Sequence, residues 1–298
     1  GGHGLLMTGT PSTGKTMLAE RIPTIMPPMS FEEIMEVTKI YSSAGLLDEK
    51  RQFITKRPFR NPHHNITGVS LTGGGIIPKP GEITLAHKGV LFLDELAEFR
   101  RDTIDLLRQP LEEKQIAISR LEHKYVYPAD FLLIAASNPC KCGYYGDEEK
   151  ECTCTASEIQ KYRGKISGPV MDRIDLHIRL HNIKYDELKD RRGMSSERMR
   201  KTIVAARDLQ RERFAKLFRS EKFSLNGNLG IRQVDKVIIL GREEESFLQA
   251  AYERYMLNPR VLFKIKKVAR TIADIAGREY VRTEDLSEAI QYREEASR

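Results

Sequence analysis

The segment that most constrains the fold of this sequence is a glycine-rich loop close to its first residue. Residues Gly9 to Thr16 read G-x-x-x-x-G-K-T, the apolar run Leu5 to Met7 stands directly before them, and a helix-compatible segment follows. A strand, this loop and a helix in succession are typical of a P-loop, and a Lys-Thr pair in that setting disfavours a simple glycine-rich turn. The sequence therefore predicts a site for the phosphates of a nucleotide.

The residue types in this loop suit phosphate and magnesium. Its two glycines let the backbone wrap closely around an anion, and successive N–H groups at a helix N-terminus point partial positive charge at it. Lys15 is expected to reach the β- and γ-phosphates, and Thr16 to offer its hydroxyl to Mg²⁺. The residues predicted to bind nucleotide here are Gly9, Thr10, Pro11, Ser12, Thr13, Gly14, Lys15 and Thr16.

A second motif pairs two carboxylates with a buried strand. The run Gly89 to Leu93 is continuously apolar and ends in Asp94 and Glu95. A buried parallel strand delivers such charges at its C-terminal edge. Taken alone this pattern is common, but after a P-loop it predicts a Walker B site, with Asp94 holding Mg²⁺ and Glu95 activating the attacking water.

Another buried strand is expected over Phe131 to Ser137, and it ends in the polar amide of Asn138. An Asn at the tip of a strand beside the γ-phosphate is able to position the hydrolytic water. We therefore predict a catalytic role for Asn138.

All four cysteines of the chain lie within fifteen residues, Cys140 to Cys154. They form two Cys-x-Cys pairs, Cys140 with Cys142 and Cys152 with Cys154, separated by nine residues. Four thiolates match the ligand count of a structural zinc site, although the usual pair is Cys-x₂-Cys. Zinc is the first interpretation, and free thiols or a reversible disulfide remain open.

Two arginines are candidates for contacting nucleotide. Arg173 stands between Asp172 and Asp175, where an ordinary surface ion pair is the simple interpretation, but it is also a candidate finger for the γ-phosphate of a neighbouring subunit. Arg260 opens a helix after Asn258 and Pro259 and is a candidate for reaching nucleotide from a second domain.

The segments between these motifs are expected to form loops and short elements. Arg57 to Gly81 is rich in Pro, His and Gly and is interpreted as an extended functional loop or hairpin. Its neighbours His63 and His64 should face opposite sides of an extended segment, which disfavours a shared metal. One helix is predicted over Arg100 to Leu111, and a hairpin over Gln115 to Tyr127.

The pattern changes near residue 182. We predict an α/β nucleotide-binding core over residues 1–181, with a cysteine-rich loop at 140–154, and an all-helical domain over 182–298. The net charge is +7, and basic residues cluster on the predicted helices. These clusters indicate either nucleic-acid contact or ordinary solvated helix faces.

The composition also bears on location. No apolar run approaches the roughly 20 residues that span a bilayer, and no signal peptide is recognisable, so a cytoplasmic protein without membrane contact is expected. The chain has no initiator Met and its first strand starts almost at once, so we expect it to be part of a longer protein.

With these motifs in order, the chain resembles the AAA+ ATPases of the magnesium-chelatase-like group, most closely the YifB/ComM branch. The resemblance spans essentially the whole sequence and rests on Gly1-Gly2-His3, Phe59 to His64, Leu93 to Leu96, Ser137 to Cys140, Ser167 to Asp175 and Val268 to Asp274.

This resemblance implies a three-layer αβα core with a parallel sheet and a helical lid. It also implies that Lys15 and Thr16 belong to Walker A, Asn138 to sensor 1, Arg173 to the arginine finger and Arg260 to sensor 2. The resemblance further implies a hexameric ring with ATP and Mg²⁺ between subunits, and single-stranded or branched DNA as the substrate of a translocating or branch-migrating motor. Two insertions, around residues 61–81 and 119–127, resemble loops that point toward the pore of such rings.

The chain departs from the family in two respects. Thr10 and Ser12 replace the Pro and Gly common in the P-loops of relatives, at variable positions that leave nucleotide binding intact. From the resemblance we also expect this sequence to lack the N-terminal domain of the family, which resembles the Lon protease fold, together with any ring stability that it supplies.

Two other functions remain open. One is a chelatase-like ATPase that helps Mg²⁺ enter a porphyrin, against which the cysteine loop argues because it fits the YifB/ComM pattern. The other is a nucleotide-switched DNA or protein-binding module without catalysis. Against this, Glu95 together with Asn138 and Arg173 argues for hydrolysis, because a pure binder needs no water-activating carboxylate.

Overall fold

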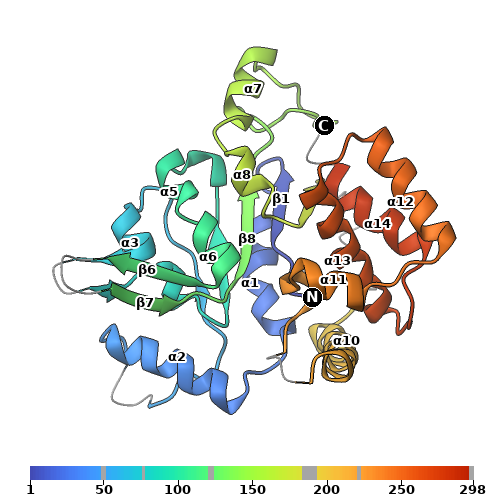
Figure 1. Ribbon diagram of the computed structural model, residues 1–298. Helices are drawn as coiled ribbons and strands as arrows, with labels where there is room; N and C mark the ends of the chain where they lie inside the picture. Colours follow the sequence, from blue (N-terminus) through green and yellow to red (C-terminus); the bar gives the residue numbers. More distant parts are fainter. Residues whose placement is uncertain (48–51, 76–77, 120–123, 183–192, 220–222, 295–298) are drawn as a thin grey trace. The chain divides into compact units, whose positions relative to one another are not determined.

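The structure is a computed structural model that describes residues 1–47, 52–75, 78–119, 124–182, 193–219 and 223–294 (Figure 1). It divides into two compact units, and each is described by itself. The core unit comprises Leu5–Ile174 and Arg179–Arg191, and the helical unit comprises Gly1–Gly4, Asp175–Ile178 and Arg192–Arg298. The domain boundary expected between residues 181 and 182 borders a stretch outside the described residues and stays a prediction.

A five-stranded sheet organises the core unit. Its strand order is β2-β5-β8-β1-β9, and the β2/β5, β5/β8 and β8/β1 pairings are parallel. The strands span Leu5–Gly9 (β1), Phe59–Arg60 (β2), Val90–Leu93 (β5), Leu132–Ser137 (β8) and Leu176–Leu180 (β9), and of β9 only Arg179 and Leu180 fall within the core unit. This arrangement with its flanking helices is the AAA+ αβα core that the sequence predicts.

Both faces of the central strands are buried, which explains their continuous apolar runs. Alternate side chains such as Leu91, Leu93 and Leu133 belong to one large core cluster. Their neighbours Phe92 and Ile134 are equally buried but lie outside that cluster. Because side chains alternate between the two faces of a strand, these residues face the opposite layer. There the helix α1 (Lys15–Ile25) packs against β1, β5 and β8.

Short helices and two small hairpins complete the core unit. The capping box of Ser30 and Glu33 starts α2. The β6/β7 hairpin is confirmed. The elements are α2 (Phe31–Ser43), α3 (Gly68–Thr72), β3 (Gly73–Gly74), β4 (Lys79–Pro80), α4 (Glu82–Leu85), η1 (Leu96–Glu98), β6 (Gln115–Ser119), β7 (Lys124–Pro128), α7 (Ala156–Arg163) and α8 (Gly168–Met171).

The single helix expected over Arg100 to Leu111 is wrong in one respect. The structure has two short helices, α5 (Arg101–Asp105) and α6 (Arg108–Glu113), joined by a turn. Ile104, near the end of α5, and Leu107, in that turn, are both fully buried. The apolar spacing therefore reports the shared core contact of the two pieces, not one continuous helix.

The second unit is built largely of helices, as the sequence predicts. Its core gathers Phe214, Leu248, Ile265 and Leu286 from four helices, and Gly277 supplies the left-handed residue, φ 68°, that ends α13. Its elements are α10 (Ser196–Leu217), η2 (Asn226–Asn228), α11 (Ile231–Val237), α12 (Arg242–Arg254), α13 (Pro259–Ile275) and α14 (Thr283–Glu294). Across the part of the chain that the structure describes, no helix has the length and apolar character needed to cross a membrane.

A buried carboxylate ties three segments of the helical unit together. Asp274 on α13 is 1 % exposed, and it accepts hydrogen bonds from Arg270, Arg213 and Asn226. The Arg270 side chain itself is 2 % exposed, and its remaining donors reach backbone carbonyls. A buried ion pair is costly to break from one side, because the partner charge stays buried without compensation.

We expect Asp274→Ala to destabilise the protein by about 3–5 kcal/mol, because it leaves the Arg270 charge buried and unpaired. Equilibrium urea unfolding followed by circular dichroism measures the loss. The matched control is Asp208→Ala, which breaks an Asp–Arg pair on the surface of α10 and should cost less than about 1 kcal/mol. Similar losses in the two variants would contradict the importance of the buried network.

Candidate active site

Three neighbouring parallel strands deliver the predicted site residues to one edge of the sheet. The P-loop follows β1, Asp94 and Glu95 follow β5, and Asn138 follows β8, which lies between them. The register pairs Thr8 with Ser137, and Leu93 with Ala135. Since parallel strands end at the same edge, segments far apart in sequence meet there, as in other open α/β sheets.

The P-loop adopts the backbone that its glycines permit. Ser12 and Gly14 are left-handed, with φ values of 70° and 81°, which turns the chain sharply into α1. A Cβ atom at Gly9 would lie 2.7 Å from the Leu180 carbonyl oxygen. Glycine is therefore required at both ends of the loop, at Gly9 for close backbone approach and at Gly14 for its conformation.

Lys15 lies across the loop. Its ammonium group donates hydrogen bonds to the carbonyls of Gly9 and Thr10, both at 2.8 Å. Burial lowers the pKa of Lys15, while the nearby carboxylates of Asp94 and Glu95 act in the opposite direction. The ammonium is thus held among the loop residues, within the electrostatic reach of both carboxylates.

Thr16 and Asp94 form the link between the P-loop and the second motif. The Thr16 hydroxyl donates to Asp94 Oδ2 at 2.7 Å, and Asp94 Oδ1 accepts the backbone N–H of Glu95 at 2.9 Å. A hydroxyl and a carboxylate are hard oxygen ligands of the kind that Mg²⁺ prefers. This donor pair fits a magnesium ion.

Glu95 has an unusual backbone and an unexpected neighbour. Its φ and ψ are 53° and 47°, a left-handed conformation that is uncommon outside glycine. Its side chain is 54 % exposed, and its Oε2 lies 3.3 Å from Nδ1 of His64. His64 in turn lies edge-on to the ring of Phe99, with centroids 6.4 Å apart. The carboxylate expected to activate water thus lies next to an imidazole nitrogen.

The expectation that His63 and His64 face opposite sides is wrong. Their rings lie 4.1 Å apart and tilted by 34°, because the chain turns at this point instead of continuing as a strand. Our sequence reasoning missed the role of His64 as a partner of Glu95. The signal available was a pair of histidines in a Pro-rich loop following the strand β2, which pairs with β5.

The two candidate arginines lie in different surroundings. Arg173 follows α8, its side chain is 10 % exposed, and its guanidinium donates to Glu112 and to the carbonyl of Pro169, both at 2.6 Å. Within one chain it thus has a carboxylate partner, Glu112, which is half exposed. Arg260 is the second residue of α13 in the helical unit and is exposed.

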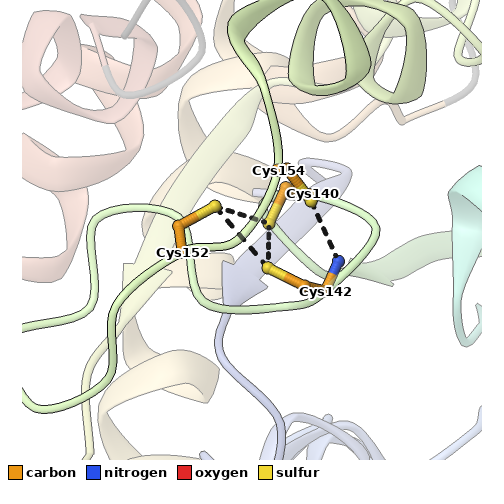
Figure 2. Close-up of side chains that lie close together, drawn as sticks. All are labelled: Cys140, Cys142, Cys152 and Cys154. Atoms are coloured by element: carbon orange, nitrogen blue, oxygen red, sulfur yellow. Dashed lines mark hydrogen bonds between the residues drawn. The ribbon is translucent and has the colours of Figure 1, made fainter.

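The four cysteines converge on one point (Figure 2). All four sulfur atoms lie within 4.8 Å of one another, and Cys140, Cys142 and Cys152 are separated by 3.3 to 3.7 Å. Tetrahedral zinc with Zn–S bonds near 2.3 Å would place its sulfurs about 3.8 Å apart. The donor set and its spacing therefore fit a zinc ion.

The thiols influence one another's ionisation. Hydrogen bonding from the backbone of Tyr144, with further help from Cys140, lowers the pKa of Cys142 to about 5. The backbone N–H of Cys154 opposes the shift at Cys152, but burial and the neighbouring sulfurs raise the pKa of Cys152 to about 12. Close thiols resist losing all their protons together, so a bound cation is what allows four thiolates at this point.

Comparison with known proteins agrees with this architecture. Residues 1–188 match the family described as magnesium chelatase, subunit ChlI, and residues 193–293 match the ChlI C-terminal family. The chain belongs to the magnesium-chelatase family. The resemblance that the sequence motifs indicate is thereby confirmed.

Individual relatives refine the placement within the family. The chain is 41 % identical over 295 residues to YifB of Salmonella typhimurium and 39 % identical over 297 residues to the competence protein ComM of Haemophilus influenzae. Each alignment covers 98 % of this chain and 56 % of the relative, so the chain spans little more than half of these proteins. The chloroplastic magnesium-chelatase subunit ChlI of Oryza sativa is 24 % identical over 221 residues, which are 74 % of this chain and 46 % of that protein.

Replacing His64 with alanine tests its contact with Glu95. We expect kcat for ATP hydrolysis to fall about 10- to 100-fold with little change in KM, because a displaced carboxylate no longer meets the attacking water. His64→Asn keeps a hydrogen-bond donor and should recover part of the rate. The matched control is His63→Ala. His63 accepts a hydrogen bond from the backbone N–H of Asn65, whereas the contact with Glu95 is made by His64. An equal loss in both alanine variants, measured by phosphate release, would refute a specific role for His64.

Proposed function

We propose that this chain is the motor part of a Mg²⁺-dependent ATPase that acts on DNA as a ring of identical subunits in the cytoplasm. The observation that carries the ATPase assignment is the 2.7 Å hydrogen bond from Thr16 to Asp94, beside Lys15 and Glu95. It joins a phosphate-binding loop to a carboxylate pair across the sheet edge. That combination serves hydrolysis, because binding alone needs no water-activating carboxylate.

In this mechanism each residue has one task. The P-loop amides and Lys15 bind the β- and γ-phosphates, and Thr16 and Asp94 hold Mg²⁺, which neutralises phosphate charge when bound. Glu95 accepts the proton of the attacking water. Asn138, at the end of β8 between β1 and β5, orients that water. His64 keeps the Glu95 carboxylate in place before this proton transfer.

The site is completed by a neighbouring subunit. Arg173 supplies positive charge to the γ-phosphate across the interface, as arginine fingers do. To do so it exchanges its Glu112 partner for phosphate, and the half-exposed position of Glu112 leaves that exchange open. Arg260 supplies a further cation from the helical unit of the chain that binds the nucleotide. A closed ring, taken here as a hexamer, gives every subunit such a neighbour.

Single-stranded or branched DNA is the proposed substrate. The support is the likeness to a competence protein together with the basic surface of α10. Five basic side chains on that helix are exposed: Arg198, Arg200, Lys201, Arg211 and Lys216. Phosphate backbones bind such surfaces by releasing counterions. Zn²⁺ held by Cys140, Cys142, Cys152 and Cys154 is proposed as a structural ion.

A chelatase-like ATPase remains the second candidate. It is favoured by the family match itself and by the rice relative, which is named a magnesium-chelatase subunit. The lower identity to that subunit, 24 % against 41 % for YifB, makes it the weaker candidate. Recovery of porphyrin-binding subunits with the purified protein would favour it over the DNA motor.

The DNA motor is tested by ATP turnover. We expect forked or single-stranded DNA to raise kcat, and Glu95→Gln to abolish turnover while ATP still binds, because the amide cannot accept the proton of water. Phosphate release is measured against protein concentration with and without DNA. Turnover that ignores DNA at every concentration would rule out the motor, and turnover at the level of buffer would rule out the ATPase.

The shared site is tested by mixing variants. Arg173→Ala should bind ATP but not hydrolyse it, and Lys15→Ala should not bind ATP. A mixed ring contains interfaces that combine the intact Lys15 of one variant with the intact Arg173 of the other, so mixing should restore part of the turnover. In the control, each variant is mixed with a double variant that carries the same substitution together with Glu95→Gln. No interface in such a mixture combines an intact Lys15 with an intact Arg173. Equal activities in all mixtures would contradict a finger acting between subunits.

A further inference from the structure

The cysteine loop touches the P-loop directly. Gly143, one residue after Cys142, has a left-handed φ of 91°, and a Cβ atom built there would lie 2.9 Å from both Cγ and Cδ of Pro11. Real Cβ atoms essentially never approach carbon that closely. A proline ring cannot swing aside as a long side chain does, because φ and the ring are fixed. The backbone of Gly143 therefore packs closely against Pro11, the third residue of the phosphate-binding loop.

A second contact joins the same two loops through Asn182. The Thr10 hydroxyl lies 3.4 Å from Asn182 Oδ1, and Asn182 Nδ2 lies 3.5 Å from Asp147 Oδ2. The pKa of Asp147 is lowered chiefly by the backbone N–H groups of Lys150 and Glu149, with a smaller contribution from Thr10. Pro11 thus contacts the cysteine loop directly, and Thr10 contacts it through Asn182.

Apolar burial contributes little to the order of this loop, which depends on hydrogen bonds and on the cysteine cluster. Cys140 is fully buried at the point where the loop leaves β8, but Lys141 and most of the residues from Tyr145 to Thr155 are exposed or half-buried. The guanidinium of Arg179 donates to the carbonyls of Tyr145 and Gly146 at 3.0 and 2.6 Å. An exposed loop with one apolar anchor gains its order from cross-links, and four metal-bound thiolates are such a cross-link.

We propose that the cysteine cluster, once it holds its metal, positions Pro11 and Thr10 and so sets the affinity of the P-loop for nucleotide. The proposal rests on the zinc site and the nucleotide site argued above. Cys140 also follows Asn138 by two residues, so the same cluster holds the strand tip that carries the water-orienting amide. Gly143 and Pro11 act as positioning residues in this arrangement.

The first experiment removes the metal from the purified chain. The holoprotein should contain one zinc per chain, and a fluorescent ATP analogue measures its Kd. Treatment with a mercurial reagent and a chelator, followed by excess dithiol to strip the mercury and by desalting into buffer with Mg²⁺, should weaken nucleotide binding on the order of tenfold, within the usual range of coupling between sites. Added Zn²⁺ should restore the Kd. A zinc-containing protein whose Kd stays the same after zinc loss would overturn the coupling.

The second experiment leaves the metal in place and disturbs the contact. Gly143→Ala pushes a methyl group into Pro11, so it should retain one zinc per chain and yet raise the Kd for nucleotide about fivefold or more. The matched control is Gly146→Ala, which also has a left-handed φ, 71°, but whose new Cβ meets the far end of the long Arg179 side chain and not the P-loop. It should leave the Kd near that of the unaltered protein.

A double variant separates contact from general damage. Pro11→Ala removes Cγ and Cδ, the atoms that a Cβ at position 143 would meet, so Gly143→Ala should raise the Kd less in a Pro11→Ala background than in the unaltered protein. Equal effects of Gly143→Ala in the two backgrounds, or equal losses in the Gly143 and Gly146 variants, would refute the proposal. Circular dichroism of each variant shows whether it is folded.

The outcomes for the underlying sites are distinct. Protein that binds nucleotide but carries no zinc as purified, without exposure to chelator, refutes the metal site and with it the coupling, while the ATPase stands. Protein that carries zinc but binds no nucleotide refutes the ATPase assignment. Protein that carries zinc, and whose nucleotide binding weakens both on zinc loss and in Gly143→Ala, supports the metal site, the nucleotide site and the coupling between them.

Discussion

The hydrogen bond between Thr16 and Asp94 is the contact on which the candidate site depends. It joins residues 78 positions apart, and it forms because β1, β8 and β5 are parallel neighbours that end at one edge. A change of register by one residue would turn every side chain of a strand to the opposite face and move the strand end. The buried faces of these strands, with Leu93 and Phe92 pointing to opposite layers, hold that register.

Loops rather than strands supply the restraints around this edge. His64 reaches Glu95 from the segment that follows β2, and Gly143 reaches Pro11 from the segment that follows β8. Each loop has its own local arrangement, a turn at His64 and Asn65 in one case and a cluster of four sulfurs in the other. Rigid strands thus bring the reactive groups together, and adjacent loops adjust their positions.

The helical unit depends on buried charge in a comparable way. Asp175 accepts from His3 and pairs with Lys264 of α13, one helical turn after Arg260. Burial acts to raise the pKa of Asp175, but Lys264 and His3 hold it well below its usual range. The helix that carries Arg260 is therefore fixed by ion pairs along its length, including those of Asp274. Such pairs are costly to break, and they restrict the helix to one position within its unit.

Local patterns in the sequence determined the elements and the residue types of the site. The P-loop, the Asp94-Glu95 pair, the strand ending in Asn138, the cysteine pairs and the helices of the second unit follow from periodicity, capping and glycine conformation, which act over a few residues. The tertiary structure decided which of them meet. The break between α5 and α6, the approach of His64 to Glu95, the pairing of Arg173 with Glu112 and the contact of Gly143 with Pro11 depend on the paths of loops through space. Those paths are set by the packing of the whole unit, and no short stretch of sequence encodes them.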